Sequence, residues 1–369
     1  MRHPCLVVML GLALVSQTRP ARKTVVSIAG REFRVNGRPT YEGRSYDGIR
    51  VQGLLFNSRM VQGIFDDRNS ATRSRWNYPD GPWDPERNTR EFIDAMPLWR
   101  AKGLLAFTIN LQGGIPEGYS RTQPWITSAF DTGGVLQPEY MARLERILDR
   151  ADELGIVAIV GFFYQGQERQ MDGEQAIVRA ADAATDWLAG RGYTHVLVEV
   201  ANEADNNGFK FDVVKPAGGA VRLIERVKER SKGKVRSPAG RLLVSTSLNG
   251  GRVPPDSLVN ALDFVLLHGN GVQDPARVTQ MVDETRKLPS YRGQPIVFNE
   301  DDHFEFGKPQ NNMLSALRAY ASWGYFDYRM SGERFDDGYQ SVPVNWTISS
   351  PRKREFFELL SRVTGVGSR

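Results

Sequence analysis

Short apolar runs recur along the chain and alternate with longer segments in which apolar residues return every three or four positions. Apolar runs bounded by polar residues are typical of strands buried on both faces of a parallel sheet. Eight such runs predict strands over Val51–Asn57, Leu104–Leu111, Val157–Tyr164, Val196–Ala201, Leu242–Ser247, Phe264–His268, Ile296–Asn299 and Tyr325–Tyr328.

The segments between these runs have the spacing of amphipathic helices. In Pro138–Leu154, Met141, Leu144 and Leu148 form one apolar stripe, and Gly155 is placed to end the helix. Strands that alternate with helices imply a parallel sheet, and eight such units imply closure, so we predict an α/β fold, the (β/α)8 TIM barrel. The other predicted helices are Glu86–Lys102, Asp172–Ala189, Val221–Ser231, Pro255–Ala261, Pro275–Lys287, Asn311–Trp323 and Arg352–Val363.

Two segments lie outside this alternation. Thr24–Pro39 predicts a short β-hairpin with a turn signal at Asn36-Gly37, and we expect it to cap the bottom of the barrel. The loop Gly63–Pro85 is long enough to be functional.

The first 22 residues predict a secretory signal peptide and a linker. Arg2 gives a positive start, and Cys5–Val15 forms an apolar core that is too short to span a bilayer. A buried N-terminal strand is the alternative. We therefore expect one catalytic domain over residues 23–369 and a secreted or periplasmic location. Cys5 is the only cysteine, so the mature chain would hold neither disulfides nor thiolate metal sites.

Composition and charge mainly argue against certain kinds of partner and cofactor. The 369 residues are 40% hydrophobic and 25% charged, with a formal net charge of +5, and no Lys/Arg block is dense enough for a nucleic-acid arm. We expect no nucleic-acid partner, no membrane contact after signal removal, and a monomer. The acidic pairs at 66–67, 301–302 and 336–337 lack calcium-loop spacing, and no nucleotide fingerprint is present, so no metal and no cofactor are predicted.

Two predicted strands end in the same Asn-Glu dipeptide. Asn202-Glu203 follows the fourth strand and Asn299-Glu300 ends the seventh, an interval close to three barrel units of roughly 31 residues each. The C-terminal ends of barrel strands meet at one mouth, so the two carboxyls can face each other. One protonated and one ionised carboxyl can together break a glycosidic bond. A single Asn-Glu pair is more simply structural, whereas two at equivalent strand ends are specific.

This arrangement resembles glycoside hydrolase clan A, the 4/7 superfamily of retaining enzymes, which includes cellulase-like and mannanase-like members. The segment REFRVNGRPTYEG at residues 31–43 is similar to the opening of these enzymes. The resemblance implies Glu203 as acid/base, Glu300 as nucleophile, a covalent intermediate and net retention. The clan's strand-6 position falls on His268. The clan's arginine at the end of strand 2 is missing, and Arg59 is the candidate to replace it. The strand-8 tryptophan is not cleanly present.

Further candidates stand at neighbouring strand ends. Asn202 could bind the sugar 2-hydroxyl, His268 could bind substrate or Glu300, and an Arg59 placed against Glu300 would keep that carboxylate ionised. Glu203 is expected to have a raised pKa. Candidate subsite residues are Tyr164, Gln165, Gln112 and Tyr328. Trp76, Trp83, Trp125 and Trp346 are either sugar-stacking platforms or packed loop anchors.

We therefore predict an exported O-glycoside hydrolase that cleaves a β-linked oligo- or polysaccharide by double displacement. Two alternatives stay open. One is a carbohydrate-binding barrel without hydrolytic activity, and the other is an unrelated barrel enzyme such as a lyase or a metal-dependent hydrolase.

Overall fold

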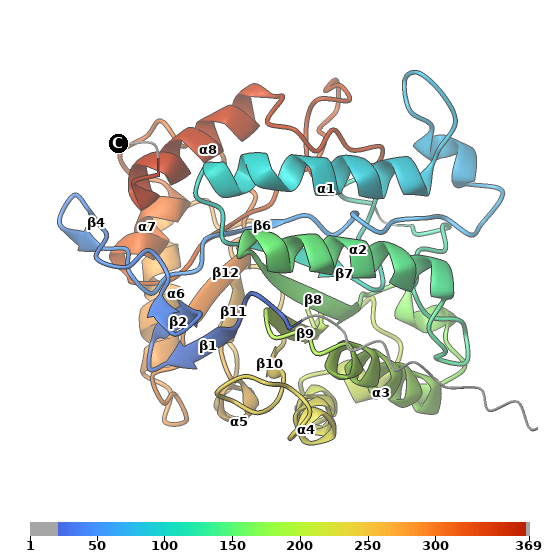
Figure 1. The fold of residues 1–369 in the computed structure, drawn as a ribbon, viewed down its shortest axis with the longest axis horizontal. Coiled ribbons are helices and arrows are strands. Elements are labelled where there is room, and N and C mark those ends of the chain that lie inside the picture. The colour runs from blue at the N-terminus through green and yellow to red at the C-terminus, as the bar shows by residue number, and fades with distance from the viewer. Residues whose placement is uncertain (1–20, 121, 367–369) are drawn as a thin grey trace, which may run out of the picture.

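Eight parallel strands form the wall of a (β/α)8 barrel in the computed structural model, which describes residues 21–120 and 122–366 (Figure 1). Six of them pair in the order β10-β9-β8-β7-β6-β13, and β11 pairs with β12. Bridges from Val297 to Ser322 and from Asp301 to Tyr325 join β12 to β13. The bounds are β6 Asn57–Arg59, β7 Ala106–Asn110, β8 Val157–Phe163, β9 Val196–Ala201, β10 Leu243–Ser245, β11 Val265–His268, β12 Ile296–Glu300 and β13 Gly324–Tyr325.

Strands β10 and β11 are joined by two hydrogen bonds that do not belong to a parallel β-ladder. The Asp263 N–H donates to the Val244 carbonyl at 3.0 Å, and the Ser245 hydroxyl donates to the Phe264 carbonyl at 2.6 Å. These two bonds close the ring of eight strands that the alternation of apolar runs and helices predicts.

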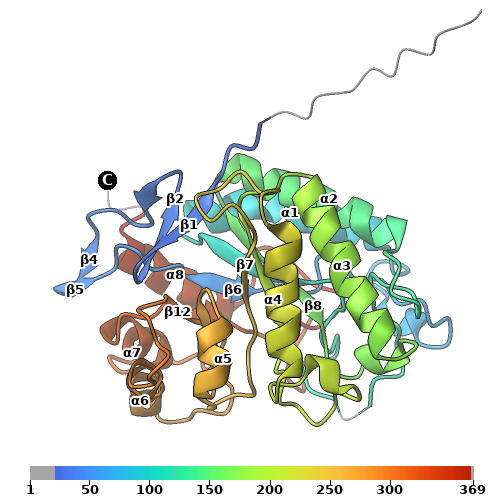
Figure 2. The ribbon, with the colours of Figure 1, turned by 90° about the horizontal axis from the view of Figure 1, so that it is seen from below.

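Eight helices surround the strands, and neighbours in sequence lie side by side, as α1 and α2 do in Figure 1 and α3 and α4 do in Figure 2. Side chains of Asp84, Asp274 and Ser350 cap helix starts, and Gly155 ends α2 at φ 69°, as predicted. The bounds are α1 Pro85–Ala101, α2 Pro138–Leu154, α3 Glu174–Gly190, α4 Gly219–Ser231, α5 Asp256–Ala261, α6 Pro275–Arg286, α7 Asn312–Arg318 and α8 Pro351–Thr364.

Three predicted boundaries were wrong. The apolar run Val51–Asn57 begins with a turn at Gln52-Gly53 and continues without regular structure, because Gly53 takes φ 87° and the Leu54 N–H donates to the Val51 carbonyl, so β6 begins only at Asn57. Helix α7 stops five residues early, where Tyr320 adopts φ 53°. Strand β13 ends at Tyr325 rather than Tyr328, because the backbone carbonyl of Asp327 bonds to a later loop instead of a strand.

The N-terminal hairpin covers the bottom of the barrel, as expected. Strands β1 (Val26–Ala29) and β2 (Glu32–Val35) are antiparallel, and β3 (Arg38–Pro39) follows after the Asn36-Gly37 turn, where both residues have positive φ. Phe33 is fully buried and packs edge-on against Phe264 at 6.1 Å. Of the predicted signal peptide and linker, residues 1–22, residues 1–20 lie outside the described residues.

The inside of the barrel changes character from bottom to top. One apolar cluster fills the lower layers with the hairpin's Val26 and Phe33 and the inward residues Ile159, Leu197, Leu243, Leu266 and Val297. Two residues further along the same strands stand the buried polar groups Glu199, Ser245, His268 and Asn299. The core therefore supports a polar floor at the C-terminal mouth, where barrel chemistry takes place.

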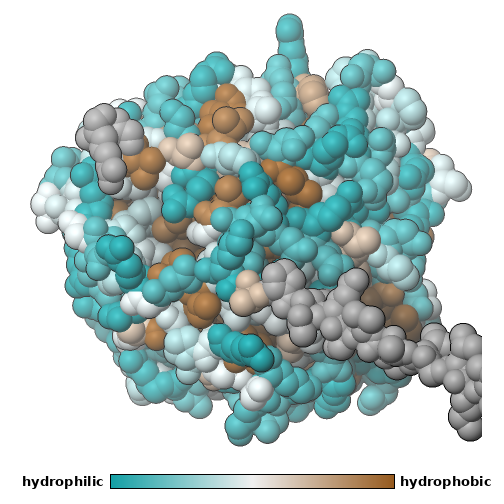
Figure 3. Space-filling view, in the orientation of Figure 1, coloured by the Kyte–Doolittle hydropathy of each residue, from teal (hydrophilic) through white to brown (hydrophobic). Residues whose placement is uncertain are grey.

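The outer surface is polar. Hydrophilic residues cover most of the face drawn in Figure 3, and hydrophobic ones form small separate patches. Over residues 21–120 and 122–366, no helix combines the length and apolar character needed to cross a bilayer.

Candidate active site

Glu203 lies directly beyond β9, in a backbone conformation that non-glycine residues rarely adopt. Its φ is 51°, in the left-handed region. Ser247 holds this turn, because its hydroxyl accepts from the Glu203 N–H at 2.9 Å and its carbonyl accepts from the Ala204 N–H at 2.9 Å. Such strained positions cost about 1–3 kcal/mol and cluster at functional sites. The turn aims the carboxyl of Glu203 across the mouth toward His268.

Glu300 is the last residue of β12 and is only 5% exposed. Arg59, itself 1% exposed at the end of β6, places Nε 2.8 Å from Glu300 Oε2. Asn270 donates from its side-chain amide to Glu300 Oε1 at 2.7 Å. Arg59 thus contacts Glu300 as the sequence predicts. Asn270 is a second neighbour of Glu300, which the sequence did not indicate.

His268 stands between the two carboxyls at the end of β11. Its Nδ1 lies 3.3 Å from Glu203 Oε1 and 3.7 Å from Glu300 Oε2. One oxygen of each glutamate and a ring nitrogen of His268 all lie within 4.8 Å of one another. The two glutamates, predicted from matching strand ends, therefore do face each other across the mouth.

The electrostatics of this group differ from the sequence-based expectation. Burial raises the pKa of Glu300, and the charges of Arg59 and His268 oppose only part of the rise. Burial also acts upward on Glu203, but the hydrogen bond and charge of His268 outweigh it, so the pKa of Glu203 is lowered. The expected raised pKa of Glu203 was wrong, because no sequence pattern places an imidazole 3.3 Å from that carboxyl.

Burial disfavours the imidazolium of His268, yet the nearby charges of Glu300 and Glu203 prevail and its pKa is raised. Glu199, a third carboxyl below the pair, has its pKa raised by burial and accepts a hydrogen bond from the Ser247 hydroxyl at 2.5 Å. Ser247 thus links Glu199 to the backbone of Glu203. The site thus holds a permanent cation, Arg59, and three acidic groups, Glu199, Glu203 and Glu300, whose charges favour the protonated form of His268.

Three more predicted residues lie beside the pair. Gln165 donates to Glu203 Oε2 at 3.2 Å, and Asn202 donates to the Gln165 side chain at 3.4 Å. The Asn202 side-chain oxygen is buried and has no protein partner among the described residues, which leaves it free to meet a ligand. Tyr164 is buried, and the charges of Arg59, Glu300 and Glu203 act on its hydroxyl.

Other predicted residues lie away from the carboxyls. The Gln112 side chain is enclosed in the wall, where it accepts from the Tyr164 N–H and contacts Ser128. Tyr328 packs edge-on against Tyr119 at 4.8 Å. The four tryptophans are at most 6% exposed and belong to the main core, so they are packed anchors and not stacking platforms: Trp76, Trp83, Trp125 and Trp346.

Sequence reasoning missed Asn270, Asn206, Ser247 and Tyr119. Asn206 donates to Glu203 Oε2 at 3.2 Å from the loop after β9. Position alone could have indicated Ser247, since it lies two residues beyond β10, and Asn270, two residues beyond β11. Nothing in the sequence marks Tyr119, which comes from a long loop after β7.

Two clusters have the residue types of a metal site. In the first, Glu203, His268 and Glu300, the guanidinium of Arg59 already contacts Glu300 and would repel a divalent ion. In the second, at residues 301–303, the oxygens of Asp301 accept hydrogen bonds from Trp323, Asn312 and His303. Both sets of ligand atoms are therefore engaged by the protein itself.

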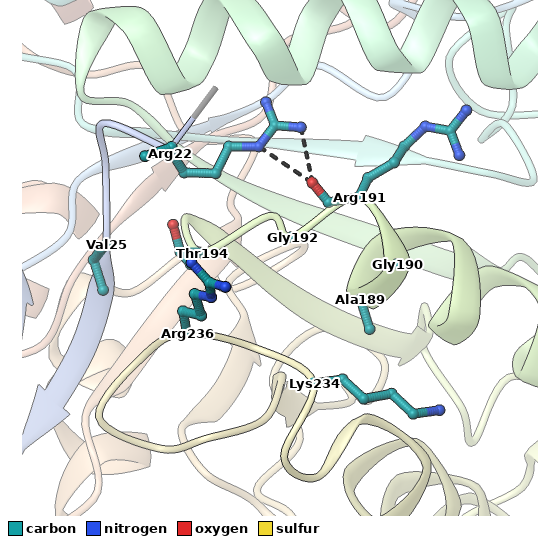
Figure 4. A pocket seen from close by; sticks show the side chains of 10 residues that line it. Arg22, Val25, Ala189, Gly190, Arg191, Gly192, Thr194, Lys234 and Arg236 are labelled. Atoms are coloured by element: carbon teal, nitrogen blue, oxygen red, sulfur yellow. Dashed lines mark hydrogen bonds between the residues drawn. The ribbon is translucent and has the colours of Figure 1, made fainter. Parts of the chain in front are cut away.

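One cavity lies beside two residues that bond Glu203, and another lies at the opposite end of the barrel. The first, about 580 Å³, is lined by Gln165 and Asn206 together with Gln123 and Arg169. The second, about 380 Å³, lies at the base, where Arg22 donates two hydrogen bonds to the Arg191 carbonyl (Figure 4). Three of its four basic groups, Arg22, Arg191 and Lys234, pair with Asp149, Glu145 and Asp186, and the fourth, Arg236, is exposed.

Comparison with known proteins gives structural matches only. No family model matches the chain, and no curated protein matches it in sequence. A glycoside hydrolase family 5 mannosidase from Rhizomucor miehei is 12% identical, with 94% of this chain and 99% of that chain covered and a TM-score of 0.52. An endo-1,4-β-mannanase from the same organism is 11% identical over 94% and 100%, with a TM-score of 0.56.

A GH5-4 broad-specificity endoglucanase from Bacteroides salanitronis is 11% identical, covering 84% of this chain and 93% of that one at a TM-score of 0.54. Likeness at this level of identity concerns the fold. The structural neighbours are thus glycoside hydrolases of family 5, and the chain has their (β/α)8 fold, with a carboxyl pair of its own at the ends of the fourth and seventh strands.

Proposed function

We propose that the protein is a retaining O-glycoside hydrolase acting on a β-linked mannan or glucan. The observation that carries this proposal is the approach of Glu203 and Glu300, whose oxygens come within 4.8 Å. Retaining enzymes keep their two carboxyl groups about 5–5.5 Å apart, and inverting enzymes need about 6.5–9.5 Å to admit a water. The names of the structural neighbours support the substrate class.

In the first step a Glu300 oxygen attacks the anomeric carbon. The bond from that carbon to the glycosidic oxygen breaks, and Glu203 gives its proton to the leaving oxygen. In the second step Glu203 takes a proton from water, the water oxygen attacks the same carbon, and Glu300 leaves. Two displacements at one carbon restore its configuration. We assign Asn202 to binding of a sugar hydroxyl, a role supported by its unpartnered side-chain oxygen.

Arg59 decides which carboxyl is ionised. Protonating Glu300 would remove the carboxylate that directly contacts the buried guanidinium of Arg59, at 2.8 Å, a loss of several kcal/mol. We therefore assign the negative charge to Glu300 and one shared proton to the pair Glu203 and His268. The proton can sit on either side of the 3.3 Å contact and must be on Glu203 when the leaving oxygen arrives.

The test is to follow the anomeric configuration of the first product by NMR. We expect an aryl β-mannoside or β-glucoside to release the β-anomer first, followed by slow mutarotation. An α-anomer as first product would contradict double displacement. Saturable binding of oligosaccharides with no turnover of any aryl glycoside would favour a non-hydrolytic carbohydrate-binding barrel. We also propose that the chain is exported as a monomer, following the signal-like N-terminus.

A shared proton makes the activity depend on pH through His268. Two bases that share one proton have an apparent pKa at least as high as that of either base alone. The substitution His268→Gln removes the base whose pKa is raised, so the alkaline limb of kcat/KM should move to lower pH. The matched control is His303→Gln, whose pKa is also raised but which bonds Asp301. If the alkaline limb of kcat/KM lies at the same pH in His268→Gln as in the natural protein, Glu203 and His268 do not share a proton.

A further inference from the structure

One side of the mouth is closed over Glu300. Tyr119, in the loop after β7, accepts from the Asn270 amide at 2.9 Å and donates to Asp302 Oδ2 at 3.0 Å. The same Asn270 amide donates to Glu300. A loop from one side of the barrel thus bonds to loops after β11 and β12 on the other side. The side-chain amide of Asn270 therefore connects the hydroxyl of Tyr119 to the carboxylate of Glu300.

This bridge is built into its surroundings. The ring of Tyr119 packs edge-on against Tyr328 at 4.8 Å and Phe326 at 6.1 Å, in the segment after β13. The Val342 N–H donates to the Pro116 carbonyl at 2.8 Å, which ties the same loop to a further segment. At Gly118, φ is 89° and an added Cβ would come within 2.9 Å of the Tyr328 ring. Backbone bonds and ring contacts thus position Tyr119, which is still 57% exposed.

The side next to Glu203 is open by contrast. The cavity of about 580 Å³ begins at Gln165 and Asn206, which both donate to Glu203 Oε2. Its lining mixes polar and apolar groups, and Arg169 is one of its lining residues, with its guanidinium bonded to the Gly208 carbonyl at 2.8 Å. The group that receives the proton of Glu203 leaves on this side, so this cavity suits the polar remainder of a glycan chain.

We infer that Tyr119 makes the enzyme chain-end specific: one terminal sugar fits over Glu300 behind the Tyr119 bridge, and the rest of the chain extends past Glu203 into the open cavity. This inference rests on the proposed function and deepens it. The attacked sugar is the one on the non-reducing side of the broken bond, so the enzyme removes single sugars from non-reducing ends. A chain that continued beyond that sugar would have to pass through the ring of Tyr119.

The experiment compares two β-linked tetrasaccharides labelled at the reducing end. One has a free non-reducing end, and the other carries a 4,6-O-benzylidene acetal on its terminal sugar. For the natural protein we expect each early cleavage to give one monosaccharide and one labelled trisaccharide, and cleavage of the blocked chain slower by roughly 100-fold or more. Equal rates on the two chains, or an early labelled product shorter than the trisaccharide, would overturn the inference.

Variants of Tyr119 test whether this residue causes the difference in cleavage rate between the free and the blocked tetrasaccharide. With Tyr119→Ala, cleavage of the blocked chain should rise by roughly tenfold or more, because the wall loses its ring. Tyr119→Phe keeps the ring and should keep the discrimination. The control Leu98→Ala changes another exposed apolar residue, on α1, and should alter neither rate. An unchanged ratio of rates in Tyr119→Ala would also overturn the inference.

Failure of the proposed function would look different. If no aryl β-glycoside and neither tetrasaccharide is cleaved, the protein is not a glycosidase. If the aryl glycoside is cleaved but the blocked tetrasaccharide reacts as fast as the free one, only the chain-end specificity is wrong. The comparison made with the natural protein does not depend on the folding of any variant.

Discussion

Replacing Glu300 by alanine is expected to lower kcat for an aryl β-glycoside by about 10⁴-fold or more, because loss of a nucleophile removes the covalent route. Its carboxylate is the one that lies against Arg59 at 2.8 Å and is held by Asn270 at 2.7 Å. The measurement is steady-state hydrolysis with a good leaving group. The control Glu305→Gln changes an exposed glutamate further along the same loop and should leave kcat unchanged.

Added azide separates the roles of the two glutamates. In Glu300→Ala, a small anion can enter the vacated space and attack the anomeric carbon once, which gives the inverted α-glycosyl azide. In Glu203→Ala, the nucleophile remains and azide attacks the glycosyl-enzyme, which gives the β-glycosyl azide. NMR distinguishes the two products. A β-azide from the Glu300 variant would mean that the two roles are assigned the wrong way round.

Replacing Arg59 by methionine is expected to destabilise the fold by about 3–5 kcal/mol near neutral pH, because it leaves a buried carboxylate without its counter-charge. Both partners are almost fully buried, at 1% and 7% side-chain exposure, so solvent screens the pair little. The pKa of Glu300, already raised by burial, should rise further. The acid limb of kcat/KM should therefore move to higher pH.

The pH dependence of stability has a definite sign in this variant. A carboxyl with a folded-state pKa above its unfolded value costs nothing while it is protonated in both states, and its full cost appears above the folded-state pKa. The stability lost in Arg59→Met should therefore grow as pH rises from about 4 to 8. Urea unfolding at several pH values measures it. The double variant Arg59→Met with Glu300→Gln should regain stability at pH 8. A loss that stayed constant with pH would argue against an ionised Glu300.

The strands that carry the carboxyl pair were predictable because their signals are local. The run Val196–Ala201 is apolar, ends in a polar pair, and is the strand β9 that the structure shows. The second pair, Asn299-Glu300, ends a strand in the same manner. A barrel then brings strand ends together by its topology, so the meeting of Glu203 and Glu300 follows from their order along the chain.

The rest of the site depends on loops and packing, where sequence patterns carry little information. Tyr119 reaches Asp302 across 183 positions, and no periodicity connects them. The tryptophans illustrate the converse limit. An aromatic residue in a loop such as Trp76 can face a ligand or the core, and only the fold shows that its indole N–H bonds Asp67 at 2.8 Å inside the core. Sequence patterns likewise did not show that the pKa of Glu203 is lowered, because this shift depends on the position of His268.

The left-handed backbone at Glu203 determines which other residues would be favourable at this position. Glycine or asparagine would occupy such a turn with less strain than glutamate. A lineage that had stopped using the acid could gain stability by accepting either residue there. The chain instead holds a long acidic side chain in this unfavourable turn, tied down by Ser247, where a residue suited to stability alone would be glycine or asparagine.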